Sequence, residues 1–181
     1  MDSLVLKYMI NEFSQNYDGN LSSEFFYKPA DSESTVAFAG PVWDLDNTYA
    51  AYARDYNEEQ IMSPKGLFIA GASRSRYWWP NLYRHEDFRQ RVRELWPRFA
   101  AAVRILLGQT EVHETALRSL AAYEAEIAES AEMNFARYPM LKGNWSQAKT
   151  GASPEENWSF LREFIEKRAE YLETAWLQGG E

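Results

Sequence analysis

Apolar residues recur at helical spacing near the start of the chain, over residues 3–15. This pattern predicts an amphipathic helix, with a cap at Asp2 or Ser3 and an end at 16–20, where Asp-Gly and Asn favour a turn. Its apolar stripe consists of Leu4, Leu6, Tyr8, Met9, Ile10 and Phe13. The polar residues between them are expected to face solvent, namely Lys7, Asn11, Glu12 and Gln15.

Helical spacing returns after residue 78 and continues almost to the end of the chain. It predicts a short helix over 79–83 with Pro80 in its first turn, and three longer helices with caps at Asp87, Thr110 and Ser153. Glu156, three residues after Ser153, completes a capping box. The residues 49–77 show no sustained period, and their apolar stretch 66–71 is expected to pack as a plug.

Two strand-like runs, 24–28 and 35–39, predict a β-hairpin between the first helix and the irregular region. The second run continues through Trp43, which is expected to anchor in the core, to Asp44. Antiparallel strands place the residues before the first strand beside those after the second. The loop around Asp18 should therefore lie at the same end of the hairpin as Asp44.

These elements predict a mainly α fold with a small β-hairpin, which is an α+β class. We expect a single domain over 1–181, in which 1–48 carries the loops and the hairpin and 78–178 gives helical support.

Composition narrows the possible chemistry. The net charge of −8 argues against a nucleic-acid partner, because phosphate recognition needs a basic face. The absence of Cys excludes disulfides, thiolate ligands and Cys nucleophiles, and the two His residues, His85 and His113, stand too far apart in the pattern to predict a zinc site. No apolar run approaches the roughly 20 residues of a membrane span, so none is expected.

The candidate chemistry is concentrated in two acidic loops, around Asp18 and at Asp44-Leu45-Asp46. The second loop, following an apolar strand, is similar to the first motif of haloacid-dehalogenase-type phosphatases. In that family the first Asp accepts the phosphoryl group and the second acts as acid and base. That fold requires a parallel sheet with alternating helices, whereas the chain after Trp78 is helical. The phosphatase remains an alternative.

The order of motifs over residues 4–48 resembles the CotH kinase family, the atypical protein kinases similar to spore coat protein H. The matching motifs are an apolar helix, Asn16-x-Asp18, an aromatic run ending in Tyr27-Lys28, and Gly40-Pro41-Val42-Trp43-Asp44-x-Asp46. Weaker similarity continues over 79–99 and at Arg168 and Leu172. The resemblance implies the C-terminal lobe of a protein-kinase-like fold. It also implies transfer of phosphate from ATP to Ser/Thr hydroxyls of a Ser-rich protein substrate.

The resemblance assigns roles to the carboxylates. Asp18 matches the catalytic-loop Asp, which accepts the proton of the substrate hydroxyl or helps to hold a metal, and Asp44 matches the Asp that binds Mg²⁺ or Mn²⁺ at the phosphates. Asp46 is expected to be an auxiliary metal ligand. Further cofactor-binding candidates are Asn16, Asn20, Ser23 and Lys28. Ser23 occupies the position at which ordinary kinases carry an Asn, and Asn20 is its candidate replacement.

Kinases also carry a phosphate-gripping Lys, its Glu partner and a covering loop upstream of the catalytic loop. Only 15 residues precede Asn16, and Lys7 lies inside a predicted helix. We therefore expect the C-terminal part of a CotH-like kinase, whose partner is the missing N-terminal lobe of the same protein. By resemblance, the location would be a bacterial spore coat, the envelope or the exterior. A non-catalytic helical module, such as a pseudokinase remnant, is the third hypothesis.

The first prediction is that the isolated chain has little or no kinase activity, because the phosphate-gripping groups are missing. The chain would be incubated with radiolabelled ATP, Mg²⁺ or Mn²⁺ and a Ser-rich protein. Strong labelling that disappears in Asp18→Asn would contradict this prediction.

Overall fold

The structure, a computed structural model, describes residues 1–16, 18–20, 22–51, 58–71, 78–110, 116–138 and 153–178. Its elements in chain order are α1 (Asp2–Ser14), η1 (Asp18–Asn20), β1 (Phe26–Tyr27), β2 (Phe38–Ala39), α2 (Glu58–Met62), α3 (Trp79–Tyr83), α4 (Glu86–Leu106), α5 (Leu120–Arg137) and α6 (Pro154–Leu177). The predicted α+β class is confirmed, since the described residues are mainly helical with one two-stranded antiparallel sheet.

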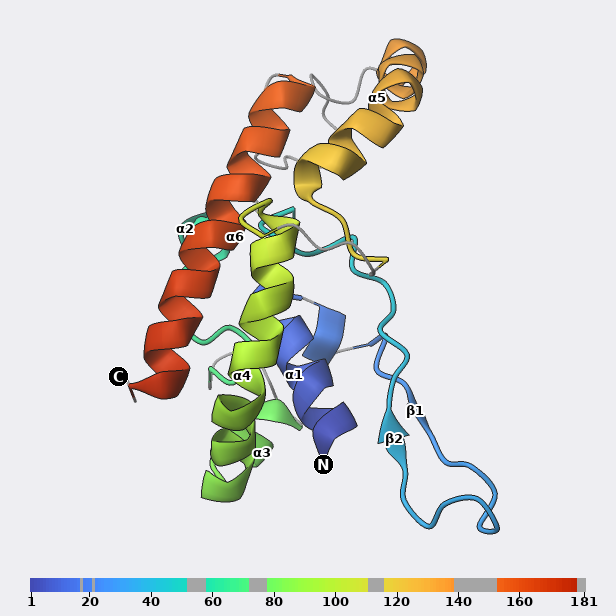
Figure 1. The fold of residues 1–181 in the computed structure, drawn as a ribbon, viewed down its shortest axis with the longest axis vertical. Coiled ribbons are helices and arrows are strands. Elements are labelled where there is room, and N and C mark those ends of the chain that lie inside the picture. Colours follow the sequence, from blue (N-terminus) through green and yellow to red (C-terminus); the bar gives the residue numbers. More distant parts are fainter. Residues whose placement is uncertain are drawn as a thin grey trace.

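Three long helices form the body of the protein. α1, α4 and α6 pack against one another, and Figure 1 shows the hairpin β1–β2 extending from the side of α1. β1 pairs with β2 in the register Phe26↔Ala39 and Tyr27↔Phe38. No helix in the described part of the chain is both long and apolar enough to cross a membrane.

An aromatic cluster fills the space between these helices. Tyr8 of α1 is fully buried, and its ring centroid lies 5.4–6.0 Å from those of four other rings, Trp79, Tyr83, Phe88 and Trp176. Trp96 of α4 meets Trp176 of α6 edge to face, with centroids 5.2 Å apart. Large rings bury much apolar area each, so this cluster contributes strongly to holding the helices together.

The polar face of α1 contradicts the sequence prediction. Four residues expected in solvent are at most 3% exposed: Lys7, Asn11, Glu12 and Gln15. α1 packs against α4 and α6 and also against β2, so its polar residues lie within the protein. Each of these side chains has a polar partner in another segment, as buried polar groups require.

Glu12 joins α1 to a distant helix and to an apolar loop. Its carboxylate accepts the backbone N–H groups of Phe68, Ile69 (2.9 Å) and Ala70 (2.9 Å). Arg168 of α6 donates to Glu12 Oε1 at 2.6 Å, and both side chains are 0% exposed. The guanidinium also donates to the carbonyl oxygens of Pro64 (2.9 Å) and Gly66 (2.6 Å). Phe68 and Ile69 are consequently buried, which confirms the predicted plug.

The helix caps were predicted with mixed success. Pro80 does lie in the first turn of α3, and the Ser153 hydroxyl accepts the Glu156 N–H at 3.2 Å, as the capping box predicts. The predicted cap at Asp87 is wrong, because α4 begins one residue earlier and Asp87 lies in its first turn. The predicted cap at Thr110 is also wrong, since α5 is capped by Ser119. Residues 111–115 lie outside the described residues.

The start of α1 also differs from the prediction, because neither Asp2 nor Ser3 caps it. Asp2 instead pairs with Arg91 of α4 at 2.6 Å, and the Ser3 hydroxyl accepts the Ala39 N–H of β2 at 3.2 Å. Both side chains therefore hold neighbouring elements against α1. The strands are shorter than the predicted runs, since only two residues of each form the ladder.

The second prediction concerns the buried ion pair. Arg168→Met should lower the free energy of unfolding by about 3–5 kcal/mol, because it leaves the Glu12 carboxylate buried without its cation. Chemical denaturation monitored by circular dichroism measures the loss.

Lys167→Met is the matched control, because Lys167 is the neighbouring residue on α6 and forms an exposed ion pair with Glu163. It should unfold at nearly the same denaturant concentration as the unmodified protein. Equal losses in the two variants would contradict a special contribution of the buried pair.

Candidate metal centre

Three carboxylates gather where the hairpin meets the Asp18 loop. Asp18 lies half-buried in η1, and Asp44 and Asp46 are exposed in the segment after β2. One oxygen of each lies no more than 4.8 Å from the corresponding oxygens of the other two. The sequence predicted that the Asp18 and Asp44 loops meet, and the structure brings them together.

The hairpin delivers Asp44 to this position. Beyond the two-residue ladder the Gly40 N–H donates to the Phe25 carbonyl at 2.9 Å, which extends the pairing by one bond. Further along, the Ser23 hydroxyl donates to Asp44 Oδ2 at 3.1 Å. Ser23 and Asp44 have φ values of 59° and 61°, in the left-handed region that costs energy for residues other than Gly. Backbone of this kind clusters at functional sites.

A chain of amide side chains positions Asp18. The Asn16 side chain accepts the Asp18 backbone N–H at 3.2 Å and donates to Asn11 Oδ1 of α1 at 3.1 Å. On the other side, Asn47 Nδ2 donates to Asp18 Oδ2 at 2.8 Å. The Asp18 carboxylate is therefore fixed between α1 and the segment that carries Asp44.

The next residue, Gly19, is closely packed against two amide side chains. A Cβ there would lie 3.0 Å from Asn11 Cγ and 3.0 Å from Asn16 Nδ2, which is tighter than ordinary contact, so these side chains would have to shift. The indole N–H of Trp79, a residue that is 1% exposed, donates to the Gly19 carbonyl at 2.9 Å. The aromatic core and the Asp18 loop are thus directly connected.

The other predicted site residues have different surroundings. Asn16 is 2% exposed and bonded within the protein, whereas Ser23 contacts Asp44 directly. The side chain of Asn20 lies outside the described part of the structure. Lys28 follows β1 toward the hairpin turn and pairs with Asp31, so the structure does not bring it to the carboxylates.

Several residues at the centre were missed by sequence reasoning. Asn47 was overlooked although it follows Asp46 directly, and Lys7, Asn11 and Glu24 were treated as ordinary helix and strand residues. The available signal was the spacing of Lys7 and Asn11, which lie four residues apart and share one face of α1.

The prediction that Trp43 anchors in the core is wrong, because the side chain is 61% exposed. Its ring packs edge to face on Phe25, with centroids 6.2 Å apart. Trp43 follows the paired part of the hairpin, outside the space between the helices, and therefore remains at the surface.

The donor set suits a hard divalent cation. Asp18 and Asp44 have neutral hydrogen-bond partners, Asn47 and Ser23, and no basic side chain among the described residues forms an ion pair with any of the three carboxylates. Mg²⁺ prefers oxygen ligands at about 2.0–2.1 Å, which puts opposite ligands roughly 4.1 Å apart. The three carboxylate oxygens lie no more than 4.8 Å apart, so a small inward movement of the side chains would bring them to the separation that Mg²⁺ requires.

Comparison with protein families gives a decisive match. The model of the family described as CotH kinase protein matches residues 1–172. The chain belongs to the CotH kinase family. No curated protein and no solved structure gave a significant match.

Membership of the CotH kinase family agrees with the resemblance noted in the sequence, and it identifies a kinase-like protein. The phosphatase alternative required Asp44 at the end of a central parallel strand. In the described residues of this CotH chain, Asp44 instead follows a two-stranded antiparallel hairpin.

Proposed function

We propose that this CotH-family chain holds Mg²⁺ or Mn²⁺ with Asp18, Asp44 and Asp46, for phosphoryl transfer from ATP to a Ser/Thr hydroxyl of a protein. The observation that carries the proposal is the meeting of three carboxylates from two separate segments within 4.8 Å. A divalent cation bound there would neutralise charge on the transferred phosphate.

The three carboxylates differ in their hydrogen-bond partners, and this difference favours a different role for each. Asp44 is held by Ser23 at one oxygen and is the main ligand. Asp18 is held by Asn47 at Oδ2, so that Oδ1 is the oxygen that accepts a substrate hydroxyl proton or completes the metal site. Asp46 is exposed and serves as the auxiliary ligand. Ser23 acts here by orienting Asp44.

The helical body would act as the C-terminal lobe of a protein-kinase-like fold. The two Lys residues nearest the carboxylates in the sequence are engaged elsewhere, Lys7 with Glu24 and Lys28 with Asp31. The Lys that grips the nucleotide phosphates would then come from an N-terminal lobe of the parent protein.

The hairpin offers a surface on which such a lobe could dock. Its exposed aromatic residues lie next to the segment that carries the carboxylates, and they are 43–61% exposed: Phe25, Phe26, Tyr27 and Trp43. Exposed apolar surface of this kind marks sites of contact with another protein surface. A lobe docked there would cover the apolar rings and face the metal centre.

The third prediction tests metal binding by thermal shift with Mn²⁺, with and without ATP. A ligand at about 100 times its Kd stabilises the folded state by about 2.7 kcal/mol, so Mn²⁺ should raise the Tm of the unmodified chain. Asp44→Asn should abolish the rise. Without metal, Asp44→Asn should unfold no earlier than the unmodified chain, because it removes one of three repelling charges.

Asp31→Asn is the matched control, since it removes one negative charge from the same hairpin but leaves the three carboxylates intact. It should keep the full Mn²⁺ response. A response of Asp44→Asn equal to that of Asp31→Asn would refute the proposed metal site.

A further inference from the structure

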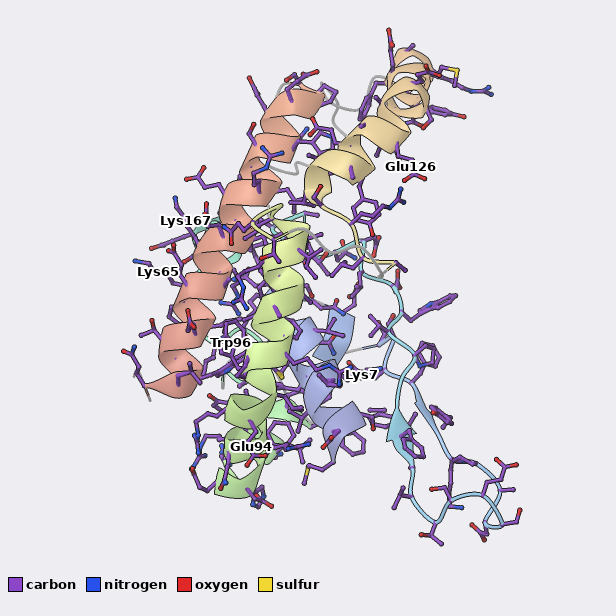
Figure 2. All side chains as sticks on the ribbon, viewed as in Figure 1. Lys7, Lys65, Glu94, Trp96, Glu126 and Lys167 are labelled. Atoms are coloured by element: carbon purple, nitrogen blue, oxygen red, sulfur yellow. The ribbon has the colours of Figure 1, made fainter. Side chains whose placement is uncertain are left out.

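We propose that Lys7 is a positioning residue that sets the spacing of the two segments carrying Asp18 and Asp44. This inference rests on the proposed metal function. Lys7 is 3% exposed and lies on the side of α1 that faces the hairpin (Figure 2). Its Nζ lies 3.3 Å from the Phe25 carbonyl, 3.3 Å from the Pro41 carbonyl and 3.1 Å from Glu24 Oε2.

These contacts connect both strands of the hairpin to one helix. The ammonium group donates to two backbone carbonyls, and its charge pairs with one carboxylate. Phe25 directly precedes β1, and Pro41 follows β2 by two residues and precedes Asp44 by three. Lys7 therefore holds the hairpin at the point where the ladder has ended and the chain departs toward Asp44.

The segment carrying Asp18 is connected to the same face of α1. Asn11, one turn after Lys7, donates to Glu24 Oε1 at 2.8 Å and accepts from Asn16, which in turn accepts the Asp18 N–H. The Glu24 carboxylate thus bridges Lys7 and Asn11. The segments that carry Asp18 and Asp44 are therefore both attached to one helix, α1.

A Lys at position 7 is better explained by its contacts with the hairpin than by a gain in the stability of the fold. A buried ammonium loses its hydration, and its partners only offset that cost. An apolar side chain of similar length would fill the space without that cost, but it would not bind the Pro41 carbonyl. Arg would not replace Lys, because its planar guanidinium cannot direct donors to these three acceptors in the same space.

The fourth prediction compares the chain with Lys7→Met and with the charge-balanced variant Lys7→Met/Glu24→Gln. Mn²⁺ affinity, measured by titration with electron paramagnetic resonance of the bound ion, should fall by about tenfold or more in both variants, as for other residues that orient metal ligands. In the metal-free protein, amide hydrogen exchange over 42–46 should be faster in both variants than in the unmodified chain.

Leu172→Ala is the control for general destabilisation, because Leu172 is fully buried on α6. Measured at a temperature where it is folded, it should keep the Mn²⁺ affinity of the unmodified chain and the same exchange over 42–46. Should Lys7→Met fail to fold, the double variant carries the comparison, because it leaves no unpaired carboxylate at Glu24.

Three results would overturn the role of Lys7. The first is unchanged Mn²⁺ affinity in both Lys7 variants, and the second is an equal loss of Mn²⁺ affinity in Leu172→Ala. The third is recovery of Mn²⁺ affinity in the double variant, because that would trace the loss in Lys7→Met to the unpaired Glu24 carboxylate. Failure of the unmodified chain to bind Mn²⁺ would instead refute the proposed function. In that case the exchange rates over 42–46 would still decide whether Lys7 holds this segment.

Discussion

The burial of polar residues on α1 is the constraint on which the rest of the structure depends. A helix that buries Lys7, Asn11 and Glu12 must supply each polar group with a partner, because an unpaired group would keep the full cost of leaving water. The partners come in sequence along the helix. Lys7 meets the hairpin, Asn11 meets Glu24 and the Asp18 loop, and Glu12 meets the backbone at 68–70 and Arg168. Distant segments are thereby placed relative to one another.

The two ends of this polar series differ in what they support. The Glu12–Arg168 pair is fully buried and fixes the helical body and the apolar plug. The Lys7–Glu24–Asn11 group lies beside the carboxylates, where burial raises the pKa of Glu24. The ion pair with Lys7 and the hydrogen bond from Asn11 oppose that rise. The three carboxylates of the candidate metal centre combine this support with negative charge that no basic side chain in the described segments pairs with.

Local sequence signals predicted much of this architecture. Pro80 and the Ser153–Glu156 capping box located helix starts, because these signals act within one turn. The hairpin pattern predicted that the Asp18 and Asp44 loops would meet, since antiparallel pairing fixes which ends are adjacent. The ligand roles of these residues remain predictions.

The failures share a physical cause, which is dependence on distant partners. Glu12 has the polarity of a surface residue, and its burial depends on Arg168, 156 residues away. Trp43 has the composition of a core residue, but the hairpin carries it beyond the helices and leaves it exposed. Lys7 was assigned to solvent for the same reason as Glu12, because helical periodicity describes one helix and not the elements that pack on it.

The central claim is that α1 holds two carboxylate segments together as one cation site. Anomalous diffraction from crystals of the chain grown with Mn²⁺ tests it most directly. The account predicts a single strong anomalous peak within coordination distance of both Asp18 and Asp44, with Lys7 still bound to the Pro41 carbonyl. Ordered carboxylates with no peak between them, or a peak only at acidic residues elsewhere, would contradict it.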